Sequence, residues 1–303
     1  MKHWFTYPLI AHPSNPAFMS REGIEAVSRA ADKAGFAGIG FTDHPAPPQK
    51  WLVGGGHDAL DPFVVLALVA ACTERLLLVP NIVVLPYRNP FVVAKAAATL
   101  DLISSGRFVL SVATGYLRSE YRNLGVDFQQ RNALFDEALD VLRGVWSQDD
   151  FDFEGIGFSA KGVTANPKPP RIPIWIGGNS ALTRRRVAAR GDGWNPFPAG
   201  EQLAQVTRTT PLRDLDDLLP MLDHLWTQVD REGRDRSEID VTFTAGVPGP
   251  GDPRFDAGAH LEALDRLSGV GVTWVSAGVP GDSLAHAIEV IEQYGAEVIA
   301  AAS

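Results

Sequence analysis

The sequence has 303 residues, a length that is usual for one α/β barrel. Hydrophobic residues make up 45% of it and charged residues 21%, which is the composition of an ordinary globular protein. The net charge is −9, and Lys and Arg do not cluster beyond Arg184-Arg185-Arg186. These features argue against nucleic acid or an anionic membrane surface as a partner.

No targeting or membrane segment is expected. The N-terminal residues Met1–Trp4 lack the apolar core of a secretory signal, and the longest apolar run, Pro62–Cys72, is too short to span a bilayer. The single cysteine, Cys72, excludes an intrachain disulfide framework. A reducing, cytoplasmic compartment is therefore expected.

The dominant pattern along the chain is an amphipathic helix, then glycine, then a short apolar strand. The helix expected at Ser20–Ala34 ends at Gly35 and leads into the strand Phe36–Phe41. The helix expected at Pro90–Ser104 leads in the same way into Phe108–Ala113. Glycine just past a helix end suits a left-handed cap, and strands that are apolar throughout suit a parallel sheet covered by helices.

Eight strands are predicted, and a helical pattern follows each. They are Trp4–Ile10, Phe36–Phe41, Leu76–Leu85, Phe108–Ala113, Ile174–Gly177, Gly193–Asn195, Ile239–Thr244 and Val272–Ala277. This order predicts a single domain over residues 1–303 that folds as a (β/α)8 TIM barrel. An open doubly wound sheet is the alternative, but Ala11–Pro16 after the first strand lacks its Gly-x-Gly-x-x-Gly turn.

Three segments interrupt the alternation. Thr42–Leu60 is rich in proline and glycine and follows the second strand, Asp149–Pro173 contains a predicted hairpin, and Phe197–Pro211 is weakly patterned. Because a barrel places its active site on the loops that follow the strands, the first of them is a candidate wall of a site. The third is a candidate cover for the barrel mouth.

Asp43 and His44 follow the second strand directly. Catalytic groups in barrels lie at this end of a strand, and a histidine exchanges protons near neutral pH. An alternative is that Asp43 caps the loop while His44 packs on the prolines that follow. Their position alone leaves both interpretations open.

Other strand ends carry weaker signals. Pro80 inside the third strand predicts a bulge near Asn81, because proline cannot donate to a sheet. Thr114 and Gly115 offer a hydroxyl and a bare backbone, and Gly177–Ser180 offers free N–H groups that suit a phosphate. Each of these segments, taken alone, is better explained as ordinary local structure such as a turn or a helix start.

Metal binding and serine hydrolysis find no support. The seven histidines form no H-x-x-x-H or H-E-x-x-H pair, and no G-x-S-x-G elbow occurs, so no metal ligands are assigned. Cys72 is expected in the middle of a helix, as a core residue.

The order of these motifs carries more information than any one of them. The series is Thr42-Asp43-His44, Asn81-x-Val83-x-Leu85-Pro86-x-Arg88-x-Pro90, Ser104-x-Gly106-Arg107, Gly115-x-x-x-x-x-Tyr121, Pro173–Ser180 and Ala189-x-x-Asp192-Gly193-Trp194. It resembles the luciferase-like monooxygenase superfamily, and within it the deazaflavin (coenzyme F420)-dependent oxidoreductases. The resemblance covers residues 1–195 strongly and the remainder weakly.

The resemblance implies a bacterial-luciferase-like TIM barrel, a homodimer, and a flavin or deazaflavin across the mouth. It implies that Asp43 and His44 approach the deazaflavin ring, with His44 handling a proton and Asp43 orienting it or touching the ring. It also implies a cis peptide between Asn81 and Ile82 behind the ring. The remaining coenzyme-binding residues that it implies are Thr114 and Gly115 along the ribityl and phosphate path and Gly177, Gly178 and Asn179 at the phosphate.

One departure from the family pattern affects the substrate. The sugar-phosphate dehydrogenases of the family carry a glutamate after the Thr-Gly pair, where this chain has Tyr116. Oxidation of a sugar phosphate is therefore in doubt, and the small-molecule substrate stays unidentified.

Three functions follow as hypotheses. The first is hydride transfer between coenzyme F420 and a small organic substrate, to which the protein adds positioning of the ring and a proton. The second is an FMN-dependent monooxygenase that uses reduced flavin and oxygen. The third is a non-catalytic deazaflavin-binding protein.

Overall fold

Polar caps and glycines separate helices from strands along the chain, which a computed structural model describes over residues 1–301. Helix α1 (Arg21–Ala34) begins after Ser20, whose hydroxyl accepts a hydrogen bond in the first turn, and it ends at Gly35 in the left-handed conformation. Helix α3 (Pro62–Cys72) begins after Asp61, whose carboxylate accepts two backbone N–H groups. The boundaries of α1 match the predicted ones because they depend on local side chains. Cys72 is buried as predicted, but it is the last residue of α3 and does not lie in the middle of a helix.

Nine strand segments form one parallel sheet. They are β1 (Lys2–Thr6), β2 (Gly38–Phe41), β3 (Leu77–Pro80), β4 (Val83–Val84), β5 (Leu110–Ala113), β8 (Ile174–Gly177), β9 (Gly193–Asn195), β10 (Asp240–Thr244) and β11 (Trp274–Ala277). Their order is β3-β2-β1-β11-β10-β9-β8-β5-β4. Segments β3 and β4 are two halves of the predicted strand Leu76–Leu85, and a bridge between Leu78 and Phe108 joins the two ends of the sheet. The predicted eight-stranded barrel is confirmed.

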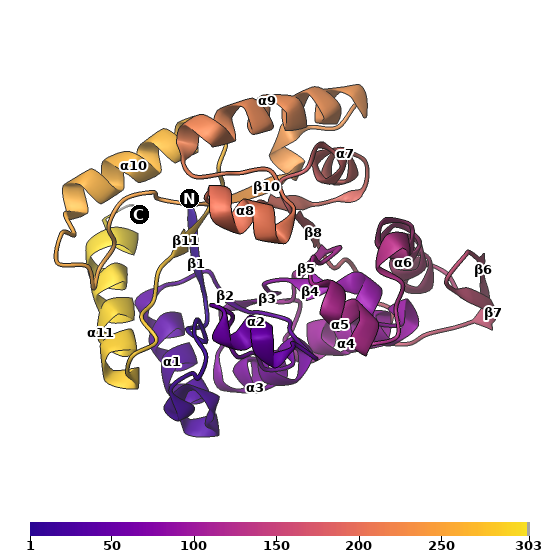
Figure 1. Cartoon of the computed structure of the whole chain (residues 1–303), viewed down its shortest axis with the longest axis horizontal. Helices are drawn as coiled ribbons and strands as arrows, with labels where there is room; N and C mark the ends of the chain where they lie inside the picture. Colours follow the sequence, from indigo (N-terminus) through magenta and orange to yellow (C-terminus); the bar gives the residue numbers. More distant parts are fainter. Residues whose placement is uncertain (302–303) are drawn as a thin grey trace.

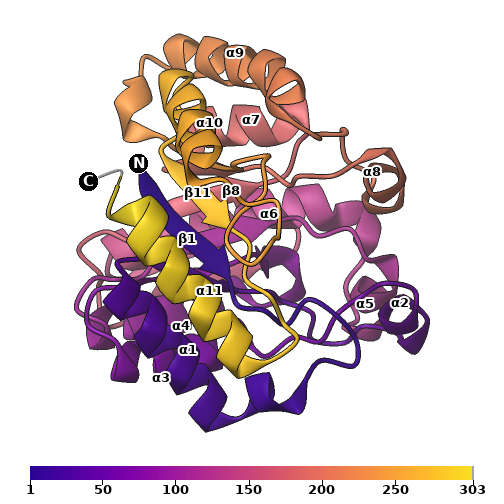
Figure 2. The ribbon, with the colours of Figure 1, turned by 90° about the vertical axis from the view of Figure 1, so that its left-hand side faces the viewer.

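The helices lie outside the strands (Figures 1 and 2). Besides α1 and α3 they include α4 (Pro90–Ile103), α5 (Arg118–Asn123), α6 (Arg131–Ser147), α7 (Ala181–Arg190), α9 (Leu215–Arg231), α10 (Ala257–Gly269) and α11 (Leu284–Tyr294). Within residues 1–301, no helix combines the length and the apolar character that a membrane span requires.

The irregular segments contain more structure than their patterns predict. Helix α2 (Gln49–Val53) lies in the first of them and α8 (Glu201–Thr207) in the third. The hairpin of β6 (Phe151–Glu154) and β7 (Ser159–Val163) is antiparallel, as predicted.

The first strand ends earlier than predicted. It ends at Thr6 and not at Ile10. The physical reason is Pro8, which has no N–H to donate to a neighbouring strand.

The barrel interior is built in layers because side chains alternate along each strand. The deeper layer contains Trp4, Trp175 and Trp274, whose rings meet edge to face with centroids 6.0 and 5.0 Å apart. Thr6 lies two residues beyond Trp4 on β1, and Asn81 lies two residues beyond Val79, which belongs to the same apolar cluster. A polar layer therefore lies above the apolar one, on the side of the barrel mouth where the predicted site lies.

Candidate active site

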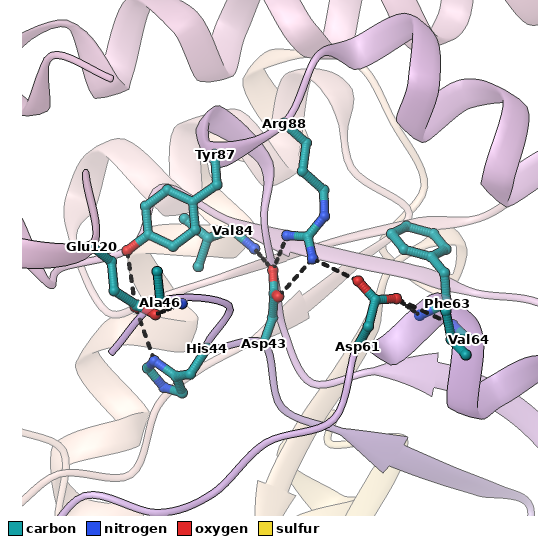
Figure 3. A network of polar contacts seen from close by, with 10 residues as sticks. All are labelled: Asp43, His44, Ala46, Asp61, Phe63, Val64, Val84, Tyr87, Arg88 and Glu120. Atoms are coloured by element: carbon teal, nitrogen blue, oxygen red, sulfur yellow. Dashed lines mark hydrogen bonds and ion pairs between the residues drawn. The ribbon is translucent and has the colours of Figure 1, made fainter. Parts of the chain in front are cut away.

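Asp43 follows β2 and its side chain is buried against the third strand (Figure 3). Both of its oxygens accept hydrogen bonds from the Arg88 guanidinium, at 2.5 and 2.9 Å, and Oδ2 also accepts the Val84 N–H at 3.0 Å. Arg88 also donates a hydrogen bond from Nη2 to Oδ2 of Asp61 at 3.2 Å, and Asp61 caps α3. Asp43 therefore ties β2 to β4 and to the start of α3.

Burial raises the pKa of the Asp43 carboxyl, while Arg88 and the Val84 amide oppose that effect. Burial also works against the charge on Arg88, but the Asp43 carboxylate outweighs it and raises the pKa of Arg88. We take both groups as charged, because the guanidinium contacts both carboxylate oxygens.

The orienting partner of His44 is Glu120, not Asp43. Its Oε2 lies 3.0 Å from the His44 Nδ1, and it is fully buried on α5. The Tyr87 hydroxyl donates to Oε2 at 3.2 Å and the Ala46 N–H donates to Oε1 at 3.1 Å. This corrects the expected orienting role of Asp43, whose carboxylate is held by Arg88; a contact between Asp43 and the coenzyme ring stays a prediction.

The contact with Glu120 assigns different tasks to the two nitrogens of the His44 ring (Figure 3). A carboxylate oxygen accepts a hydrogen bond, so Nδ1 carries the hydrogen in this contact. Nε2 is then the ring nitrogen that remains for a ligand.

Aromatic side chains surround His44. Its ring centroid lies 4.3 Å from that of Trp51 on α2, 5.1 Å from that of His57 and 6.3 Å from that of Tyr116. Burial lowers the pKa of His57, and burial raises the pKa of Tyr116 against the effect of a hydrogen bond with Trp51. The segment after β2 thus supplies a wall beside His44, in the position that the sequence predicts.

A polar network forms the floor beneath this wall. The Asn81 side chain donates to the Thr6 hydroxyl at 2.6 Å and accepts from the Asn195 side chain at 3.0 Å. Asn195 also donates to the Ser111 hydroxyl at 3.2 Å and accepts from Thr242 at 2.7 Å. Side chains from β1, the third strand, β5, β9 and β10 therefore hold one another inside the barrel.

The peptide bond between Asn81 and Ile82 is cis, which confirms that prediction. It separates β3 from β4. The Ile82 side chain packs so closely on Gly177 that a Cβ added there would lie 2.2 Å from Ile82 Cδ1. This contact brings the third strand against the start of the turn after β8.

Thr114 and Gly115 follow β5, beside the third strand. Gly115 has a φ of +66°, and an added Cβ would lie 2.5 Å from Val84 Cγ1, so conformation and space both require glycine. The Tyr121 hydroxyl donates to the Thr114 carbonyl. The backbone of this turn is therefore held in one shape.

The turn after β8 presents backbone N–H groups at the start of α7. Within residues 1–301, the N–H groups of Asn179 and Ser180 donate to no other group of the chain. The Asn179 side chain is buried and fully used, since it donates to the carbonyls of Phe197 and Thr210 and accepts the Phe197 N–H. It holds the segment after β9, and only its backbone is free to meet an anion.

Several residues at this site were not singled out from the sequence. They are Trp51, His57, Tyr87, Glu120 and Asn195. Glu120 is the most informative omission, because it lies 76 positions from His44 and its acidic character on a short helix resembles that of any surface glutamate. Glu120 immediately precedes Tyr121 in the family spacing that runs from Gly115 to Tyr121, and this position was the signal that could have identified it.

Comparison with known proteins agrees with the geometry. The family model described as luciferase-like monooxygenase matches residues 3–210. An F420-dependent glucose-6-phosphate dehydrogenase of Intrasporangium calvum is 28% identical over 313 residues, which covers 91% of this chain and 86% of the relative.

Solved structures share the barrel at low sequence identity. The monooxygenase RslO1 from Streptomyces bottropensis has a TM-score of 0.81 at 17% identity and covers 100% of both chains. The coenzyme F420-dependent tetrahydromethanopterin reductase from Methanopyrus kandleri has a TM-score of 0.73 at 16% identity and covers 99% of both. At these identities the likeness is one of fold.

Proposed function

Since this chain belongs to the luciferase-like monooxygenase family and is an oxidoreductase, we propose that it transfers a hydride between coenzyme F420 and a small organic substrate. The observation that carries the proposal is the His44 ring, whose Nδ1 contacts a buried glutamate and which lies among the rings of Trp51 and Tyr116. Such an arrangement suits transfer of a proton to or from a bound molecule.

The residues present fit a deazaflavin with a phosphate. The free N–H groups of Asn179 and Ser180 at the start of α7 would hold the phosphate, and the adjoining part of the coenzyme would run along the backbone of Gly115. Gly177 and Gly178 complete the turn, and Thr114 adds a hydroxyl beside it. Asn81 and Ile82 would lie behind the ring. The F420-dependent relative of Intrasporangium calvum supports this choice of coenzyme.

When bound, the deazaflavin supplies two-electron hydride chemistry and reacts poorly with oxygen. The role of the protein is to position the coenzyme and the substrate and to supply or accept a proton. A carbonyl or imine that gains a hydride also gains a proton, and His44 Nε2 is the group placed to give or take it. Glu120 keeps the ring in one orientation, while Trp51 and Tyr116 exclude water from one side of it.

An FMN-dependent monooxygenase is the second candidate. The observation that favours it is the full-length match to the RslO1 monooxygenase, with a TM-score of 0.81. This function differs from F420-dependent hydride transfer in one measurable respect, because a monooxygenase would consume oxygen with reduced FMN. A non-catalytic deazaflavin carrier is the third candidate and would bind coenzyme without turnover.

We also propose that the protein is a homodimer that uses α3 and α4. Both helices are apolar on most sides, yet each exposes large side chains. These are Val64 at 73% exposure, Val92 and Leu102 at 65% and Ile103 at 57%. A second copy that covers them would complete the burial. A cytoplasmic location stays part of the proposal and is supported by the unpaired thiol of Cys72.

The deciding experiment is a paired titration of the purified protein with coenzyme F420 and with FMN, followed by absorbance and ring fluorescence. We expect tighter binding of F420, and bleaching or recovery of its absorbance with an alcohol, aldehyde, imine or enone. Equal or tighter binding of FMN together with oxygen uptake would transfer the assignment to the monooxygenase. Binding of F420 without turnover across the whole panel would leave a carrier protein.

A further inference from the structure

A cavity lies beside the aromatic rings around His44, between α5 and α8. It has a volume of about 540 Å³, which is within the range of small-ligand sites. Tyr116 lines it, and the same ring lies 6.3 Å from the ring of His44. Figure 2 shows α2, α5 and α8 along one side of the molecule. A ligand that occupies the mouth therefore has this cavity as its neighbour.

The cavity is lined by three arginines. Arg118 and Arg122 come from α5, and Arg208 follows the last residue of α8. Within residues 1–301, none of the three forms an ion pair with a carboxylate. The chain as a whole carries a net charge of −9, so a concentration of unpaired positive charge is a local exception.

The buried ring of Phe128 lies against two of these arginines, Arg118 and Arg208, and against a neighbouring one, Arg131. The guanidinium carbons of Arg118 and Arg208 lie 4.7 and 5.8 Å from the centroid of Phe128, and that of Arg131 lies 4.1 Å from it. A ring face attracts a cation, so Phe128 offsets part of the repulsion between them. Arg208 also has a φ of +56°, a left-handed conformation that a residue with a side chain adopts at a cost.

We propose that Arg118, Arg122 and Arg208 form an anion subsite, which binds a phosphate or carboxylate group on the part of a ligand that leaves the mouth. The inference rests on the proposed function in one respect, namely that the ligand lies at His44. A guanidinium donates two parallel hydrogen bonds to such a group, and three of them around one cavity match a dianion. The hydroxyl of Ser119 adds a neutral donor at the same wall.

Two sources share this chemistry. The anion belongs either to the coenzyme or to an acidic substrate that lies against the coenzyme. In both cases the subsite is separate from the backbone N–H groups of Asn179 and Ser180, because it is made by side chains from α5 and α8.

The test uses the full-length protein and inorganic pyrophosphate as probe, measured by isothermal titration calorimetry at low ionic strength. The double variant Arg122→Gln/Arg208→Gln is compared with the wild type. Arg266→Gln is the matched control, because Arg266 is exposed on α10 and forms no ion pair within residues 1–301. We expect the wild type and the control to show a pyrophosphate site that the double variant lacks, or binds about tenfold or more weakly, whatever the turn at Asn179 and Ser180 binds.

Titration of the same proteins with coenzyme F420 separates the two sources. A parallel loss of F420 affinity assigns the anion to the coenzyme, whereas unchanged F420 affinity assigns it to the substrate. Absence of pyrophosphate binding by the wild type, or equal binding by the double variant, would overturn the subsite. A wild type that binds pyrophosphate but no F420 would instead contradict the proposed function and leave the subsite standing.

Discussion

The Nδ1 atom of His44 lies 3.0 Å from the Oε2 atom of Glu120, although 76 positions separate the two residues in the chain. His44 follows β2 and Glu120 lies on the helix that follows β5. The glutamate is fully buried, and every group that contacts its two oxygens is a donor. The pair therefore gives the histidine one orientation, and within residues 1–301 Nε2 has no hydrogen-bond partner.

Replacing His44 by alanine should remove the proton-handling group without removing the coenzyme site. We expect turnover to fall by roughly 10²–10⁴, the effect of one general acid–base group, with the affinity for F420 nearly unchanged. Stopped-flow measurement of F420 absorbance gives turnover, and titration gives affinity. His286→Ala is the control, because His286 is a half-exposed residue on α11 that pairs with Asp282 and lies outside the candidate site. Near wild-type turnover in a folded His44→Ala protein would refute the catalytic role.

Glu120→Gln should lower turnover through the position of His44. A carboxylate accepts from His44, Tyr87 and Ala46 together, whereas an amide accepts at one end only and presents an N–H₂ group to the others. We expect a loss of about ten- to a hundredfold in kcat, with a smaller change in the Kd for coenzyme. Glu262→Gln, an exposed position on α10, should change neither quantity. An unchanged kcat in Glu120→Gln would show that the contact does not matter for turnover.

His3 predicts how stability depends on pH. Burial, followed by nearby positive charge, lowers the pKa of His3 to about 4 from its ordinary value of 6.5. Above pH 6.5 both the folded and the unfolded chain carry a neutral ring; as the pH falls from 6.5 toward 4, only the unfolded chain takes up the proton. His3 should therefore remove about 2 kcal/mol of stability between pH 7 and pH 5.

Urea unfolding at pH 7 and pH 5 measures this dependence. His3→Gln should lose less stability over the interval than the wild type, by about the same 2 kcal/mol, because the glutamine does not titrate. Both proteins share all other titrating groups, so their difference isolates His3. Identical losses in the two proteins would contradict the assignment.

Charges placed on α3 and α4 should separate the homodimer. Val64→Asp and Val92→Asp each put a carboxylate on the apolar face where a second copy is expected. We expect light scattering to report a dimer for the wild type at micromolar concentration and a monomer for the variants. Ile156→Asp is the control, because Ile156 is 69% exposed but lies beside the hairpin of β6 and β7. A monomeric wild type would end the proposal.

The sequence predicts what depends on neighbours along the chain. Ser20, Gly35 and Asp61 mark helix ends through contacts within a few residues, so their boundaries are predictable. The alternation of apolar strands with helices predicts a parallel sheet covered on both faces, and the number of eight such units favours its closure into a barrel. Motif order added the family, and with it the cis bond at Asn81-Ile82, which composition and periodicity do not predict.

The tertiary structure decided which polar groups meet. Asp43 and Glu120 are both acidic residues next to chemically useful positions, and nothing local distinguishes the one that touches His44. Arg88 donates two hydrogen bonds to Asp43, and it is Glu120 that contacts the histidine. Pairing of this kind depends on distances between strands that are far apart in sequence, since a buried charge is stable only beside its partner, and closure of the barrel sets those distances.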